Sequence, residues 1–232
     1  MTSVNLIRAG AFSGLLVAAS PALAVTNLLV NGDFSAGNVD FTSSYTYVVP
    51  AYVSGQGPWH GGLYTITPAS SVGSASEYGN GWSVPSLAGN VLLANGASTQ
   101  YSNVATPGSS VWSEMVSVSA HTNYVFSFYV VAVDGATYAD LQPTITGTQG
   151  VGLTAEQGTW QQGMMSWNSG TNTTATLSLA DLNSVEFNND FALADLSLTG
   201  GVPEPSTWAM TLLGFAGLGF MSFRGSRKTA IA

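Results

Sequence analysis

Positive charge is confined to the two ends of this 232-residue chain. The four basic residues are Arg8, Arg224, Arg227 and Lys228, so the region from Val25 to Val202 contains neither Lys nor Arg, while it holds all but one of the twelve acidic residues. Such a region cannot neutralise phosphates, and it offers no Arg to a phosphoryl or carboxylate substrate. The composition therefore excludes nucleic acids and nucleotides as partners, and it leaves neutral glycans and divalent cations.

The N-terminal end has the layout of an export signal. Arg8 is followed by an apolar stretch, Ala9 to Ala19, and by the small-x-small triplet Ala22-Leu23-Ala24. This pattern predicts a signal peptide over residues 1–24, with Ala22 and Ala24 forming the site that signal peptidase cleaves. A retained membrane anchor is the less favoured alternative, because the apolar stretch is too short to span a bilayer.

The C-terminal end consists of three successive blocks: the tripeptide Pro203-Glu204-Pro205, an apolar run to Phe223, and the basic cluster. Spanning hydrocarbon takes roughly 17 to 25 helical residues, and the segment 206–223 falls at the short end of that range. The sequence predicts a transmembrane helix over about 206–223, with the basic end on the cytoplasmic side. The alternative is a buried C-terminal helix of a globular domain.

These blocks resemble the PEP-CTERM (VPEP) sorting signal, through Val202-Pro203-Glu204-Pro205-Ser206, the apolar helix and the terminal Arg/Lys cluster. The resemblance covers residues 201–232. It implies handling by an exosortase of Gram-negative bacteria that make exopolysaccharide, with the PEP box as recognition or cleavage region. The implied sorting residues are Pro203, Glu204, Pro205, Arg224, Arg227 and Lys228. The product would be membrane-anchored in the cell envelope, or extracellular after processing.

The region 25–200 is predicted to be one all-β domain. It contains no Cys, so a hydrophobic core must stabilise it, and Gly, Ser, Thr and Asn are abundant. About ten strands separated by turns favour a two-sheet, jelly-roll-like β-sandwich, flanked by the signal-peptide helix and the transmembrane helix. The predicted strands are 26–31, 45–53, 63–67, 90–94, 111–118, 123–133, 144–147, 158–167, 173–179 and 191–198. In 123–133, alternation places Tyr124, Phe126, Phe128 and Val130 on one face.

Three stretches resemble carbohydrate-binding-module sandwiches: NLLVNGDFSAG, GNVLLANG with VWSEMVSVSAHTNYVFSFYV, and TATLSLADLNSVEFNNDFALADLSLTG. The resemblance implies neighbouring first and last strands and, in some members, a structural Ca²⁺ ion near them. By position, Asp33 and Asp195 would be its carboxylates, with Asp190 as a further candidate and backbone carbonyls completing the shell. Many members have a second acidic residue where this chain has Ala194. The alternative is that these aspartates are solvated turn residues.

Aromatic side chains in Gly-rich stretches are the candidates for glycan binding, because sugar C–H faces stack on flat rings. They are Trp59, Tyr78 and Trp82. The alternative is that these rings are buried under a long loop.

Catalysis has less support, since neither a GxSxG nor an HExxH motif occurs. Glu77, Glu114, Glu156 and Glu186 could supply a glycosidase pair only if two of them faced each other across a cleft. The sequence therefore predicts an exosortase-sorted, non-catalytic protein of the cell surface or exopolysaccharide matrix, with no cofactor beyond that Ca²⁺. The alternatives are a neutral-glycan-binding module and, less favoured, a glycoside-active enzyme.

Overall fold

The computed structural model describes residues 26–49, 61–72, 82–99, 105–133, 139–183, 185, 189–200 and 214. The predicted signal peptide lies outside these residues, and so does the predicted transmembrane segment, apart from helical Gly214. Within the described ranges, no helix is long and apolar enough to cross a membrane.

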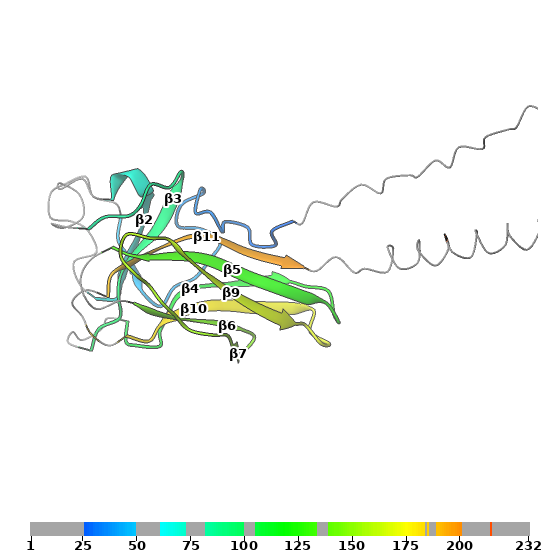
Figure 1. Ribbon diagram of the computed structural model, residues 1–232. Coiled ribbons are helices and arrows are strands. Elements are labelled where there is room, and N and C mark those ends of the chain that lie inside the picture. The colour runs from blue at the N-terminus through cyan, green and yellow to red at the C-terminus, as the bar shows by residue number, and fades with distance from the viewer. Residues whose placement is uncertain are drawn as a thin grey trace, which may run out of the picture.

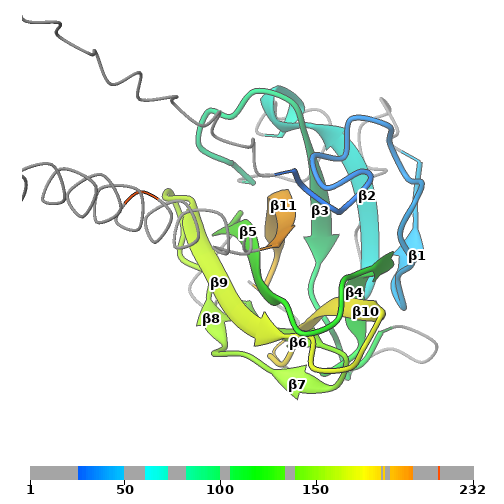
Figure 2. The same cartoon turned by 90° about the vertical axis from the view of Figure 1, so that its right-hand side faces the viewer.

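The described residues form two facing β-sheets (Figures 1 and 2). The six-stranded sheet has the order β1 (Thr46–Tyr47), β2 (Leu63–Pro68), β3 (Asn90–Asn95), β11 (Phe191–Gly200), β5 (Asn123–Ala132), β9 (Gln161–Asn168). The other has the order β4 (Ser110–Ser117), β10 (Thr174–Asp181), β6 (Asp140–Ile145), β7 (Thr148–Gln149), and β8 (Leu153–Thr154) also pairs with β6. A short 3₁₀ turn, η1 (Ala69–Ser71), follows β2. The two-sheet, all-β prediction is confirmed.

The main core fills the space between the sheets. The predicted apolar face of β5 is buried there. Trp112 of β4 stacks on Phe126, with ring centroids 5.9 Å apart, and Phe126 packs on Phe128, with centroids 5.7 Å apart. Burying each side chain of this size contributes roughly 1.5–3 kcal/mol. A second, smaller cluster lies on the other face of the six-stranded sheet. It joins Val91 and Leu93 of β3 to Val131 of β5 and to Trp82.

The predicted strand over 26–31 is wrong, because this segment makes only an isolated bridge between Asn27 and Thr199. The Asn27 side chain is the cause. Its Oδ1 accepts hydrogen bonds from the backbone N–H groups of Leu29, at 3.1 Å, and Leu198, at 2.9 Å. A side chain that bonds to nearby backbone in this way competes with the strand ladder.

The predicted strand over 144–147 is misplaced, because β6 runs through Pro143 instead of starting after it. Proline lacks the N–H that a central strand needs. The Pro143 carbonyl, however, accepts a bond from Gly150 N–H at 2.9 Å, so it points away from β10, on the side where the missing N–H would also have pointed. No bond to β10 is lost, and β6 continues.

A β-bulge at Asp195 sets the register of β11. The pairing with β5 shifts there, and Asp195 has a left-handed φ of 48°. Leu193 faces the main core before the bulge, and Leu196 and Leu198 face it afterwards. Unbroken alternation would instead have turned Asp195 and Ser197 inward. The bulge therefore keeps a carboxylate out of the core.

Asp181, at the end of β10, is a fully buried carboxylate that connects several loops. Its oxygens accept hydrogen bonds of 3.0–3.3 Å from the backbone N–H groups of Ala97, Asp140 and Asn183 and from the Asn189 side chain. Burial raises the pKa of Asp181 to about 6, although the backbone donors oppose that shift. The charged form thus opposes folding at neutral pH.

We expect the stability that depends on Asp181 to be greatest in acid. Because its folded pKa lies above the unfolded value of 3.8, the proton is bound more tightly in the folded state. About 3 kcal/mol of stability should be lost as the pH rises from about 4 through 6. Urea unfolding at a series of pH values measures this loss. Asp181→Asn should remove that part of the pH dependence, and an equal slope in both proteins would contradict the expectation.

Candidate functional site

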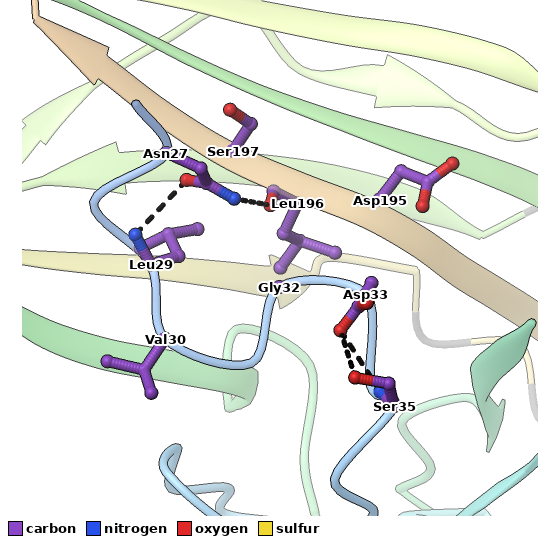
Figure 3. A pocket seen from close by; sticks show the side chains of 9 residues that line it. All are labelled: Asn27, Leu29, Val30, Gly32, Asp33, Ser35, Asp195, Leu196 and Ser197. Carbon is purple, nitrogen blue, oxygen red and sulfur yellow. Dashed lines mark hydrogen bonds between the residues drawn. The ribbon is translucent and has the colours of Figure 1, made fainter. Parts of the chain in front are cut away.

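An open pocket of about 350 Å³ lies between the N-terminal segment, here residues 26–42, and β11 (Figure 3). Asp33 comes from the segment and Asp195 from the bulge. The structure thus brings together two of the three carboxylates that the sequence suggested for calcium. The lining residues are Asn27, Leu29, Val30, Gly32, Asp33, Ser35, Asp195, Leu196 and Ser197.

The pocket exists because the N-terminal segment is fixed to β11. Asn27 Nδ2 donates to the Leu196 carbonyl at 3.0 Å, and Leu196 N–H donates to the Gly32 carbonyl at 2.8 Å. Gly32 is required by this close approach, because a Cβ at that position would lie 2.0 Å from the Leu196 oxygen. The same residues therefore position both walls of the pocket.

The two carboxylates have different surroundings. Asp33 Oδ1 accepts hydrogen bonds from the Ser35 backbone N–H at 3.1 Å and from the Ser35 hydroxyl at 2.8 Å. These bonds, the backbone one first, lower the pKa of Asp33, so it is ionised at neutral pH. Asp195 is exposed on the bulge, and Figure 3 shows its carboxylate directed away from Asp33.

The residues present fit a calcium ion only in part. Calcium takes six to eight oxygen ligands, whereas the pocket offers two carboxylates and the hydroxyls of Ser35 and Ser197. The Gly32 and Leu196 carbonyls already accept hydrogen bonds. Among the described residues, no group of three or more His, Cys, Asp or Glu side chains could hold a metal. Calcium binding stays a prediction.

A calcium titration tests this prediction. If Asp33 and Asp195 share the ion, millimolar Ca²⁺ should raise the Tm of the wild-type protein, because a ligand that binds only the folded state stabilises it. The increase should be lost in the double variant Asp33→Asn, Asp195→Asn. Differential scanning calorimetry provides the measurement, with the exposed Asp40→Asn as the control. A Tm independent of Ca²⁺ would remove the metal from this pocket.

The other suggested metal residue lies elsewhere. Asp190 is buried directly before β11 and does not line the pocket. Ala194, at the position where the resemblance expects an acid, packs in the second hydrophobic cluster.

Of the three suggested glycan platforms, only Trp82 is among the described residues. Its side chain is 9% exposed and packs in the second cluster against residues of β3 and β5. A platform for sugar stacking presents a ring face to solvent, and this ring is largely covered. Trp59 and Tyr78 lie outside the described residues. So do Ala22, Ala24, Pro203, Glu204, Pro205, Arg224, Arg227 and Lys228.

We expect Trp82→Ala to act on stability. Removing a buried Trp leaves a cavity and costs roughly 3–5 kcal/mol, while Trp82→Phe should cost less because it retains an aromatic ring. Thermal and urea unfolding measure both effects. An unchanged Tm, combined with loss of polysaccharide binding, would instead make Trp82 a binding platform.

Sequence reasoning missed the residues that build the pocket. Asn27 falls within the predicted strand 26–31, and nothing in the sequence marks Gly32 as a contact residue. The contact between Gly32 and Leu196 joins positions more than a hundred residues apart, so no local pattern indicates it. The sequence does indicate that Glu114 is buried, because this glutamate stands between Trp112 and Val116 on the apolar face of the alternating stretch VWSEMVSV.

Residues 201–228 match the PEP-CTERM protein-sorting motif. This motif implies an exported protein that an exosortase sorts through a C-terminal membrane signal. No curated protein matches the chain.

Several solved structures are similar to this chain. One is the Stig cyclase Fisc from Fischerella sp. TAU, at 9% identity and TM-score 0.51, covering 76% of this chain and 98% of the cyclase. Another is the CBM22-1 xylan-binding domain of Paenibacillus barcinonensis Xyn10C, at 15% identity and TM-score 0.41, with 78% and 97% covered. A third is TmCBM61 in complex with β-1,4-galactotriose, at 12% identity and TM-score 0.43, with 75% and 97% covered. For the cyclase, at 9% identity, the likeness concerns the fold alone.

Proposed function

We propose that this chain is a non-catalytic protein of the cell surface or exopolysaccharide matrix, delivered there by an exosortase. The observation that carries the proposal is the sorting motif at residues 201–228. Signal peptidase removes residues 1–24, the segment 206–223 holds the protein in the membrane, and the exosortase acts at the PEP box.

The charge distribution supports delivery to a polysaccharide environment. All basic residues lie in the two end segments, so the region between them carries carboxylates without fixed cations. Such a surface repels anionic polymers and does not repel neutral ones. The region from Val25 to Val202 would therefore remain soluble beside neutral glycans, and it would not adhere to nucleic acids or acidic polymers.

The placement of the glutamates supports a role without catalysis. Glycoside hydrolysis needs two carboxyl groups across one cleft. Glu114 is buried in β4 and Glu156 is exposed after β8, and the groove that Glu114 lines includes the exposed Asp40 but not Glu156, so these two glutamates do not form a pair. Glu77 and Glu186 lie outside the described residues.

Mass spectrometry of the protein recovered from its native cells tests the proposal. The mature protein should begin at Val25 and end at or near the PEP box, and it should be found outside the inner membrane. Replacing Pro203 and Pro205 by Ala should remove the extended backbone at the membrane edge and leave the tail uncut. Thr159→Ala, at an exposed turn residue, serves as the control. An intact product in the cytosol, with Met1 and Ala232 both retained, would refute the proposal.

A further inference from the structure

The outer edge of β4 borders a second open groove. This groove is larger than the pocket lined by Asp33 and Asp195, called the aspartate pocket below. β4 is the first strand of its sheet, so only one side of it pairs with β10. On the other side, Thr42 exchanges two backbone bonds of 2.8 Å with Ser113. A groove of about 610 Å³ opens here, between β4 and the N-terminal segment, and Glu114 lies in its wall.

Glu114 occupies a position of β4 that belongs to the core. Trp112 and Val116, two residues before and after it, are buried in the main core, and its partner on β10 is the buried Leu177. The Glu114 side chain is only 7% exposed. A carboxylate at such a position costs free energy unless its oxygens have partners.

One carboxylate oxygen of Glu114 is available to a ligand. Oε1 accepts a hydrogen bond from Val30 N–H at 3.0 Å, while Oε2 has no hydrogen-bond partner among the described residues. Oε2 is also not one of the enclosed polar atoms that lack partners, so it remains reachable from the groove. Burial raises the pKa of Glu114, the Val30 N–H opposes that shift, and the Asp40 charge adds to it.

Apolar side chains line the same groove. Val30 is 75% exposed and Met115 is 69% exposed, and both line the groove. Phe41 is half-buried, and its ring packs edge-to-face on the fully buried Phe34, with ring centroids 5.7 Å apart. That contact holds the Phe41 ring in place. The groove therefore combines a fixed ring, exposed apolar groups and a hydrogen-bond acceptor.

We propose that this groove binds a chain of a neutral polysaccharide, with Glu114 Oε2 accepting a hydrogen bond from a sugar hydroxyl and Phe41 contacting a C–H face of the sugar. Sugars present these two surfaces together, and the open shape admits a polymer. The proposal rests on the proposed function in taking the ligand from the surrounding matrix.

The charge of the chain argues against an anionic polymer or a second copy of the chain as the occupant. An anionic polymer would meet Glu114 and Asp40, with no Lys or Arg between Val25 and Val202 to attract it. A second copy of this chain would bring the same unbalanced negative charge. A neutral glycan brings hydroxyl donors and no charge, which is what an acceptor without a cationic neighbour can use.

Affinity electrophoresis of the full-length protein in detergent tests the proposal, with dextran, laminarin and hydroxyethyl cellulose as neutral probes and alginate as the anionic one. At least one neutral probe should retard the protein, and alginate should not. Glu114→Gln should weaken the retarding interaction about tenfold, because it removes a charge-assisted acceptor. Met115→Ala should weaken it severalfold. Met164→Ala is the matched control, since Met164 is 62% exposed on β9 in the other sheet.

The Met115→Ala variant keeps the test informative if Glu114→Gln unfolds the protein, because Met115 is exposed and its truncation leaves the core intact. The proposal is overturned if no neutral probe binds, or if Met115→Ala and Met164→Ala have equal effects. It is also overturned if oligolysine binds in place of the neutral probes, which would assign the groove to a cationic peptide. A dimer that Met115→Ala dissociates would assign it to a second copy. Because binding is measured on purified protein, its failure is distinguishable from a failure of sorting.

Discussion

The backbone bond between Leu196 and Gly32, and the close contact that surrounds it, determine how this sandwich is closed. The contact holds the N-terminal segment against β11, and Leu29 and Phe34 of that segment enter the main core. It depends on a glycine on one side and on the Asp195 bulge on the other. Without the segment, the core would be open at one edge, and neither the aspartate pocket nor the β4 groove would have its second wall.

Because the region from Val25 to Val202 contains no Lys or Arg, the buried carboxylates of Asp181 and Glu114 are held by N–H donors. In many proteins a buried acid is paired with Lys or Arg, but the exported region has neither. Asp181 is held by four N–H donors, and Glu114 by one. Both have a raised pKa, because hydrogen bonds compensate only part of the lost hydration. The difference between them is useful: Asp181 is enclosed and connects loops, whereas Glu114 retains an oxygen for a ligand.

The sequence indicated what depends on local pattern. Alternation identified β5 and its buried face, and the order of blocks in the tail identified the sorting motif. It was wrong where a side chain or an unusual pairing overrides local propensity, as at Asn27 and Pro143. It placed Asp33 and Asp195 near each other only through resemblance. It could not show that β4 is the first strand of its sheet, with its outer edge against the N-terminal segment, because that placement depends on strand order and not on the residues of β4.

The central position of β11 has a mechanical consequence. This strand is bonded to β3 on one side and to β5 on the other, and the chain continues from it into the sorting segment. A pull on the tail acts along the strand direction. It therefore strains the two rows of hydrogen bonds together in shear, and does not peel one strand from an edge. A tension applied at the C-terminal end of β11 would therefore be resisted by a strand that is bonded on both sides.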